Sequence, residues 1–474
     1  MMSRVEVLKI IKSCVVVIIL GLPLVLQAQN ISGYWIDTLK IGHFQLRLVV
    51  HIVEQDYRYH ADLYSIDQTD AVVPASKVEI AGDTISIVYN MINAKFKGIF
   101  NSTTDKINGI FKQGEVYQTS FHRLTTLPAV ERPQTPLPPY QYTEEEWTVA
   151  AAKNSPELKG TLTLPLIPCK AVAVLVAGSG PVTRNETIMR HEVFKVLSDR
   201  LTQSGIAVIR YDKRGVGESK GDYAKATVFD FAEDAKRVLL QAKKDKRFKG
   251  VPIGIVGHSE GGLIAEILAA DKQASPDYVV LMAAPVQQCG SLLVDQVRML
   301  MQASDVPAEE VEAGVRQQQF IVNMLQKYGE KTLDVFDNEL QQYKQQLDTN
   351  GKEWQLWKDF NKWKSLLPSY PWLCSFVNID PEKYICRSRC DILFLGGDKD
   401  VQVPAVKNAD LLYQYLPEDV LLKKKQKLRV IVFTDRNHLF QTCTTGLPCE
   451  YTFISETMGE DVMFAISKWI SGDR

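Results

Sequence analysis

The period of the hydrophobic pattern changes once along the chain, and this change constrains the fold more than any other feature. From about residue 30 to 126, apolar and polar residues alternate in short runs such as F-Q-L-R-L-V-V-H-I-V, separated by Gly, Asn, Asp and Ser turns. Such alternation is typical of half-buried strands, so residues 30–126 are predicted to form an all-β domain. We interpret its four scattered histidines as ordinary strand residues: His43, His51, His60 and His122.

A proline-rich stretch separates this region from the remainder. Residues 127–141 contain five prolines and have no hydrophobic period, which predicts a stiff, extended linker. Over residues 142–474, apolar runs of strand length such as A-V-A-V-L-V-A and I-L-F-L-G-G alternate with helical stretches such as 229–244. Continuous apolar strands are buried on both faces, which predicts a mainly parallel sheet covered by helices. Active sites in such sheets lie at the carboxyl ends of the strands.

The first residues have the pattern of an export signal. Lys9 and Lys12 precede an apolar run over residues 14–26, which is shorter than the ~20 residues that span a bilayer. We therefore expect a signal peptide over residues 1–28 and a periplasmic or secreted protein with no stable membrane span after cleavage. An uncleaved N-terminal anchor is the alternative.

Composition narrows the function classes. The formal net charge is -1, without the excess of Lys and Arg that nucleic-acid binding requires, so we expect a small-molecule or short-peptide substrate. The eight cysteines are too irregularly spaced for a zinc site, and we predict no metal site. Whether Cys443 and Cys449 pair in an oxidising compartment stays open, as does the oligomeric state.

The sequence G-H-S-E-G at residues 257–261 lies between a strand-like run, I-G-I-V, and a helical run, L-I-A-E-I-L-A-A. A G-x-S-x-G between a strand and a helix indicates a nucleophile elbow, in which small flanking residues allow a strained turn to expose the serine hydroxyl. Ser259 is therefore the candidate nucleophile, and it requires an adjacent base.

The base and the acid are sought further along the chain, because the triad in this setting runs Ser, acid, His. His438 is the only one of the seven histidines that follows Ser259, which makes it the candidate general base. Two aspartates, Asp398 and Asp400, follow the run I-L-F-L-G-G. We favour Asp400, which lies in the loop beyond the strand, and Asp398 remains the alternative.

Two backbone N–H groups are required for the oxyanion that forms when the serine attacks. The predicted donors are the N–H of Glu260 and that of Ser179 or Gly180 in the loop G-S-G-P. That loop lacks the G-x-G-x-x-G of a dinucleotide site. The charged turn Y-D-K-R-G-V-G-E-S is interpreted as packing beneath the site, with Asp212 and Arg214 structural rather than catalytic.

The motifs G-S-G-P, Y-D-K-R-G-V-G-E-S, G-H-S-E-G, G-G-D-K-D-V-Q-V-P and N-H-L-F-Q, in this order, resemble those of exported bacterial α/β-hydrolase fold proteins described as serine aminopeptidase-like or esterase-like. The resemblance runs from about residue 142 to the C-terminus. It implies an α/β-hydrolase fold with a mainly parallel sheet and a helical cap, here preceded by a small all-β domain. It also implies no cofactor, and carboxylesterase more often than peptidase activity. At G-S-G-P-V-T-R-N the chain lacks an acidic residue that commonly follows the proline.

The segment between Ser259 and Asp400 is longer than a minimal core requires, and its helical pattern over about residues 286–385 predicts a cap. Four aromatic residues recur there at helical spacing, which favours core packing, with an acyl-binding wall as the alternative. They are Trp354, Trp357, Phe360 and Trp363.

The predicted reaction is hydrolysis of a carboxylic ester through an acyl-enzyme. Hydrolysis of an amide or an N-terminal peptide bond is the alternative, and it requires acidic groups for the substrate amine. Glu309, Glu310 and Glu312 are available in the predicted cap. An alternative of another class is a binding protein with an inactive site.

Overall fold

The computed structural model describes residues 31–41, 44–56, 58–69, 71–347, 351, 353–354, 357 and 370–472. The chain divides into two compact units, one ending at Pro128 and one that starts at Ala129 and also takes in residues 67–69. The predicted signal peptide lies outside the described residues. Within the described part, every helix is too short or too polar to cross a bilayer.

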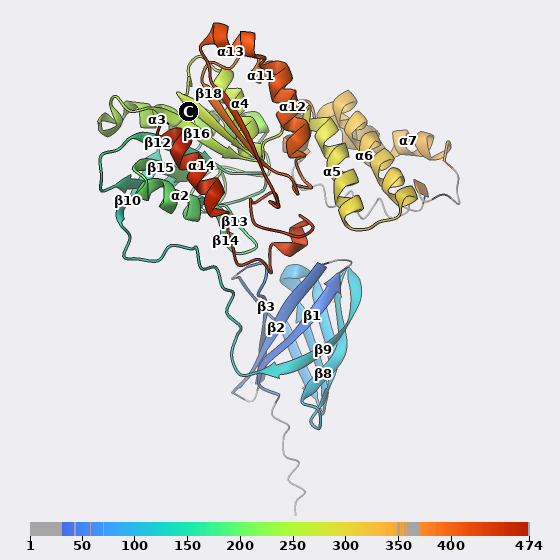
Figure 1. Ribbon diagram of the computed structural model, residues 1–474. Coiled ribbons are helices and arrows are strands. Elements are labelled where there is room, and N and C mark those ends of the chain that lie inside the picture. The colour runs from blue at the N-terminus through green and yellow to red at the C-terminus, as the bar shows by residue number, and fades with distance from the viewer. Residues whose placement is uncertain are drawn as a thin grey trace, which may run out of the picture. The chain divides into compact units, whose positions relative to one another are not determined.

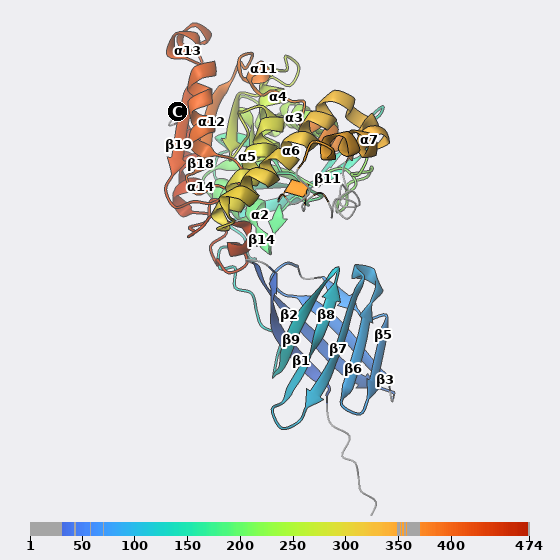
Figure 2. The same ribbon diagram turned by 90° about the vertical axis from the view of Figure 1, so that its right-hand side faces the viewer.

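The first unit is a nine-stranded sheet with the strand order β4-β3-β2-β1-β9-β8-β7-β6-β5 (Figures 1 and 2). Its strands alternate between buried and exposed residues, as along β7, where Ala94, Phe96 and Phe100 face the core. This confirms the period-two prediction, since one face of the sheet is packed and the other is solvated. The strands are β1 (Gly33–Ile41), β2 (Phe44–Gln55), β3 (Arg58–Ser65), β4 (Val72–Pro74), β5 (Lys77–Ala81), β6 (Thr84–Tyr89), β7 (Ala94–Asn101), β8 (Lys106–Gln113) and β9 (Glu115–Leu124).

The second unit contains an eight-stranded sheet with the order β10-β11-β15-β12-β16-β17-β18-β19. The first two strands are antiparallel to their neighbours, and all pairs from β15 to β19 are parallel. The predicted mainly parallel sheet is thereby confirmed. Its strands are β10 (Tyr142–Val149), β11 (Leu158–Pro165), β12 (Ala171–Val176), β15 (Ile206–Tyr211), β16 (Ile253–His258), β17 (Tyr278–Met282), β18 (Asp391–Gly397) and β19 (Leu428–Phe433). A separate pair is formed by β13 (Thr187–Ile188) and β14 (His191–Glu192).

Helices cover both faces of this sheet (Figure 1). On one face lie α2 (Val193–Gln203) and α14 (Glu460–Ile470). The other face carries α3 (Val228–Lys244), α4 (Glu260–Ala270) and α12 (Ala405–Tyr415), with the short α11 (Glu382–Ile385) and α13 (Glu418–Lys424) nearby. Every residue of β12, β15, β16 and β17 is buried, which is why these strands are mainly apolar, with Arg210 and His258 as buried polar exceptions.

A helical insertion lies between β17 and β18, where the cap was predicted (Figure 1). Its described part includes α5 (Cys289–Ala303), α6 (Ala308–Tyr328), α7 (Thr332–Lys344) and α10 (Tyr370–Phe376). Trp357 is 1% exposed and packs in the insertion's own core, with its ring centroid 5.4 Å from that of Phe320 and 6.1 Å from that of Tyr343. The core interpretation therefore holds for Trp357, while Phe360 and Trp363 lie outside the described residues.

Part of the predicted linker is bound along the second unit. The side-chain oxygen of Gln134 accepts hydrogen bonds from the N–H groups of Thr457, at 2.6 Å, and Met458, at 3.1 Å, and its amide nitrogen donates to the Met458 carbonyl. Arg132 donates to the carbonyl oxygens of Met189 and Thr452. Proline content predicts an extended backbone but says nothing about side chains that anchor it.

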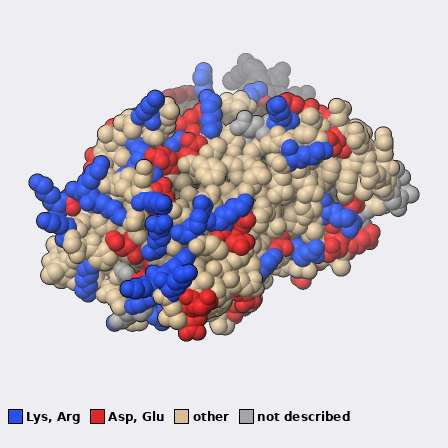
Figure 3. All heavy atoms as spheres, turned by 90° about the horizontal axis from the view of Figure 1, so that it is seen from above, with Lys and Arg blue, Asp and Glu red and all other residues tan. Residues whose placement is uncertain are grey.

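None of the cysteines among the described residues forms a disulfide, and this includes Cys443 and Cys449. On the face drawn in Figure 3, Lys and Arg side chains stand close together over part of the surface, with Asp and Glu among them. Both signs of charge are thus interspersed there.

Candidate active site

Ser259 occupies a strained turn between β16 and α4. Its backbone has φ 53° and ψ -118°, a region that few residues other than glycine adopt. The two motif glycines are required by close packing: a Cβ on Gly257 would collide with the Gly261 carbonyl oxygen, and one on Gly261 with the Val176 carbonyl oxygen. A strained serine between a strand and a helix, flanked by tightly packed glycines, is the geometry of a nucleophile elbow.

His438 and Asp400 come together although they follow different strands. His438 Nδ1 lies 2.7 Å from Asp400 Oδ2, and both side chains are almost fully buried. The other carboxylate oxygen accepts from the N–H groups of Gln402, at 2.8 Å, and Val403, at 2.9 Å. Asp400 is thus fixed as an acceptor that holds one imidazole nitrogen, whereas the alternative Asp398 is exposed.

The imidazole stands beside the elbow. The ring centroid of His438 lies 4.8 Å from that of His258, which directly precedes Ser259. The Ser259 hydroxyl forms no hydrogen bond with any residue that the structure describes. Such catalytic hydrogen bonds are often long or poorly aligned without substrate, and tighten when it binds.

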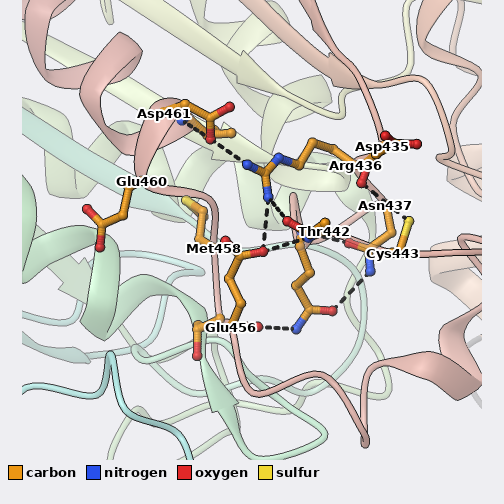
Figure 4. Close-up of polar contacts among 12 residues, drawn as sticks. Asp435, Arg436, Asn437, Thr442, Cys443, Glu456, Met458, Glu460 and Asp461 are labelled. Carbon is orange, nitrogen blue, oxygen red and sulfur yellow. Dashed lines mark hydrogen bonds and ion pairs between the residues drawn. The ribbon is translucent and has the colours of Figure 1, made fainter.

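A dense polar network holds the loop that carries His438 (Figure 4). The Asn437 side-chain oxygen accepts from the N–H groups of Leu439 and Gln441, both at 3.0 Å. The Arg436 guanidinium donates to three side chains, namely Thr442, Glu456 at 2.9 Å and Asp461 at 2.8 Å (Figure 4). These contacts fix the loop backbone, and with it the direction of the imidazole.

The glycine-rich loop after β12 reaches the nucleophile. Val176 pairs with Gly257 in the parallel ladder, so Gly178 and Ser259 stand at matching positions two residues further on. A Cβ built on Gly178 would lie 3.4 Å from the Ser259 Cβ. Among the described residues, no group accepts a hydrogen bond from the N–H of Ser179, Gly180 or Glu260. The predicted donor Glu260 and the two alternatives Ser179 and Gly180 therefore have unpaired N–H groups in this part of the described structure.

A buried ion pair joins the two donor segments. Lys213 Nζ lies 2.8 Å from Glu260 Oε2 and donates to the Gly178 carbonyl oxygen at 2.5 Å. The side chains of Lys213 and Glu260 are 5% and 1% exposed. Trp372 Nε1, from α10 of the helical insertion, donates to Glu260 Oε1. The insertion thus contacts the residue that follows the nucleophile.

The charged turn after β15 is structural in its contacts. Asp212 pairs with Arg184 and accepts the N–H of Glu218 at 3.0 Å. Arg214 pairs with Asp230 at 2.9 Å and Asp234 at 2.7 Å, both on α3. These contacts agree with the interpretation of Asp212 and Arg214 as packing residues.

Sequence reasoning did not single out four residues of this region: Glu186, Lys213, His258 and Trp372. Both Lys213 and His258 belong to motifs that were recognised in the sequence. Lys213 lies two residues after the end of β15, and His258 is the last residue of β16. A charged or polar side chain at such a position cannot reach water easily, so it is expected to have a specific partner. That signal was present, but the partner is visible only in three dimensions.

Comparison with known proteins finds a family match and a sequence relative for part of the chain. A family model described as Serine aminopeptidase, S33 matches residues 187–323, which include Ser259 but neither Asp400 nor His438. Esterase EstD of Thermotoga maritima is 27% identical over 284 residues, which are 60% of this chain and 58% of that protein. The match therefore covers less than two thirds of that relative's length.

Two of the solved structures that match the chain share little sequence with it. An esterase of Pyrococcus furiosus is 15% identical with a TM-score of 0.39, over 70% of this chain and 92% of that chain. A proline iminopeptidase of Mycobacterium smegmatis is 14% identical with a TM-score of 0.42, over 69% and 97%. The chain combines an N-terminal all-β unit with an α/β-hydrolase fold, as predicted, and within that fold it is similar to the serine aminopeptidase S33 family and to an esterase.

Proposed function

We propose that this protein is a serine hydrolase that cleaves carboxylic esters through an acyl-enzyme. The observation that carries the proposal is the buried contact between His438 Nδ1 and Asp400 Oδ2, 2.7 Å long, beside the strained turn of Ser259. With Nδ1–H donated to Asp400, the other ring nitrogen is left unprotonated. It is then the base that a serine hydroxyl requires.

In the proposed reaction, His438 removes the proton from Ser259 as its oxygen attacks the ester carbonyl carbon. The oxyanion is stabilised by the N–H of Glu260 and that of Ser179 or Gly180, which have no other acceptor among the described residues. His438 then donates the proton to the leaving alcohol, and water, activated by the same imidazole, hydrolyses the acyl-enzyme. Besides the ester and the attacking water, the proposed steps use side chains and backbone groups of this chain.

A short-chain p-nitrophenyl ester tests the proposal. The purified protein should hydrolyse it, the Ser259→Ala variant should lose that activity, and the exposed Ser102→Ala in the first unit should retain it. A fluorophosphonate should label the wild-type protein once and leave the Ser259→Ala variant unlabelled. Equal ester hydrolysis by wild type and Ser259→Ala would refute the assignment. Failure of the probe to label the folded protein would instead favour a binding protein with an inactive site.

Amide hydrolysis is the second candidate, favoured by the match to the serine aminopeptidase S33 model. An aminopeptidase needs a carboxylate for the substrate amine, but Glu312 of the predicted set is paired with Arg298. Aminoacyl p-nitroanilides assayed beside their ester counterparts decide between the two. Ester hydrolysis without measurable anilide hydrolysis supports the first proposal.

We further propose that the protein is exported, on the strength of the sequence at residues 1–28. Fractionation of expressing cells should place the protein outside the cytoplasm. N-terminal sequencing should find the mature chain starting near residue 29, whereas an intact N-terminus in the membrane fraction would indicate an uncleaved anchor.

A further inference from the structure

His258 is a buried titratable residue that the proposed reaction does not use. Its ring is 1% exposed, and each ring nitrogen has one partner. Nδ1 lies 2.9 Å from Oε1 of Glu186, and Nε2 lies 3.0 Å from the backbone oxygen of His438. Glu186 is itself fully buried.

Both partners of the His258 ring are hydrogen-bond acceptors. A carbonyl oxygen only accepts, so Nε2 carries a hydrogen. Glu186 Oε1 also accepts the N–H of Gly178 at 2.5 Å, and Oε2 is buried without a hydrogen-bond partner among the described residues. If Glu186 is ionised, Nδ1 donates to it and the ring is an imidazolium with a proton on each nitrogen; a protonated Glu186 would instead donate to a neutral ring. Paired in this way, two buried charges compensate each other, whereas either alone would be costly.

The two side chains connect three separate parts of the candidate site. Glu186 holds Gly178, whose neighbours Ser179 and Gly180 are the proposed oxyanion donors. His258 precedes the nucleophile along the chain and holds the backbone of the general base, His438. Each contact therefore fixes a backbone position rather than a reacting atom.

We propose that Glu186 and His258 form a buried carboxylate–imidazolium pair that positions the oxyanion loop and the His438 backbone around Ser259. Neither residue touches the reacting atoms, so both are positioning residues. The inference rests on the proposed serine hydrolase function for its catalytic consequence, but the charge state of the pair is independent of any activity.

The electrostatic surroundings agree with this geometry. Burial by itself lowers the pKa of His258, but the charge and hydrogen bond of Glu186, the His438 carbonyl and the charge of Asp400 together raise it. The titratable groups that face the ring are thus Glu186, Asp400 and the imidazole of His438, of which two are carboxylates.

The decisive variant is Glu186→Gln, which keeps an oxygen acceptor for Gly178 but removes the charge. Its control is Glu192→Gln, six residues further along the same segment, where the carboxylate contacts Lys195 and Asn185 instead. Because misplaced groups lower the rate of the bound complex, Glu186→Gln should reduce kcat about 10–100-fold while changing KM less than about threefold. The control should retain wild-type kcat. Neither variant should lose labelling by a fluorophosphonate.

Two readouts do not depend on turnover. In NMR of protein labelled with ¹⁵N at the histidine rings, His258, assigned with a His258→Gln variant, should carry two ring protons at about pH 7 in the wild type and one in Glu186→Gln. Amide hydrogen exchange over residues 176–182 and 436–442 should become faster in Glu186→Gln only.

The outcomes separate this inference from the proposed function. A wild-type His258 with a single ring proton near pH 7 would overturn the inference, as would a folded Glu186→Gln with unchanged kcat and unchanged exchange. A wild type that shows the imidazolium and the exchange difference but hydrolyses no ester supports the pair and refutes the proposed function. If Glu186→Gln does not fold, the wild-type NMR and a Glu186→Asp variant, which keeps the carboxylate, test whether the pair is charged.

Discussion

Lys213 Nζ lies 2.8 Å from Glu260 Oε2 inside the second unit, where both side chains are almost fully buried. The same ammonium donates to the Gly178 carbonyl oxygen at 2.5 Å. One side chain therefore joins the loop after β12 to the residue that follows the nucleophile. Since both segments carry proposed oxyanion donors, their separation depends on this lysine.

Removing the charge of Lys213 should therefore affect stability and activity together. Lys213→Met leaves the buried Glu260 carboxylate without its cation, and among the described side chains only the neutral N–H of Trp372 still donates to it. A buried pair broken on one side costs about 3–5 kcal/mol of unfolding free energy. Urea denaturation measures the loss, and ester hydrolysis by the folded fraction should show a lower kcat. The double variant Lys213→Met with Glu260→Gln should recover part of the stability. A single variant as stable as the wild type would contradict the prediction.

Trp372 is expected to hold the helical insertion against the elbow. Trp372→Phe keeps an aromatic ring for stacking with Phe376, whose centroid is 5.1 Å away, but removes the N–H that Glu260 accepts. The expected loss in unfolding free energy is about 1.5–3 kcal/mol, the range for a hydrogen bond to a charged group. Thermal or urea unfolding checks the value. Loss of activity toward bulky esters but not toward acetate esters would assign the insertion a part in substrate selection.

Asp400→Asn should reduce kcat by about 10⁴-fold, because an amide in place of the carboxylate favours the wrong imidazole tautomer. The matched control is Asp398→Asn, two residues earlier and exposed, which should stay within about twofold of wild type since it does not contact His438. Steady-state kinetics with a p-nitrophenyl ester compares the two. Equal losses in both variants would reopen the choice of acid.

Glu266 on α4 should make stability depend on pH. It is 2% exposed, neither carboxylate oxygen has a hydrogen-bond partner, and burial raises its pKa well above the ordinary value. The folded state therefore holds this proton while the unfolded chain releases it above about pH 4.3, so stability is lost as pH rises from there toward the folded pKa, by about 1.4 kcal/mol per unit.

Glu266→Gln removes that proton linkage. Its unfolding free energy should exceed that of wild type at pH 8, with a smaller difference at pH 5, as measured by urea denaturation at both values. Glu233→Gln on the exposed side of α3 is the control and should follow the wild-type pH dependence. A wild-type protein whose stability does not fall relative to Glu266→Gln between these pH values would contradict the prediction.

Much of the fold was predictable because its signals are local. Period-two alternation predicted the first sheet, and apolar runs predicted β12 and β15 to β19. Burial on one or both faces of a strand produces a hydrophobic pattern that is visible within a few residues. The candidate nucleophile and base could also be identified from the sequence. Ser259 lies between a predicted strand and a predicted helix, and His438 is the only histidine after it.

The partners of these residues were not local. Asp398 and Asp400 stand two residues apart, and the contact of Asp400 with His438 depends on the parallel pairing of β18 with β19, which aligns Gly397 with Phe433. Trp357 packs in the core of the helical insertion rather than lining an acyl-binding wall. Cys443 and Cys449 form no disulfide although they are near in sequence.

The amino-acid sequence by itself determined the two kinds of sheet, the elbow around Ser259 and the order of the candidate triad. Only the tertiary structure decided that Glu186 contacts His258 and that Lys213 contacts Glu260, pairs separated by 72 and 47 residues. The physical reason is that the hydrophobic period of a strand or helix depends only on the residues of that one segment. A buried hydrogen bond, in contrast, depends on which strand ends the completed sheet brings side by side.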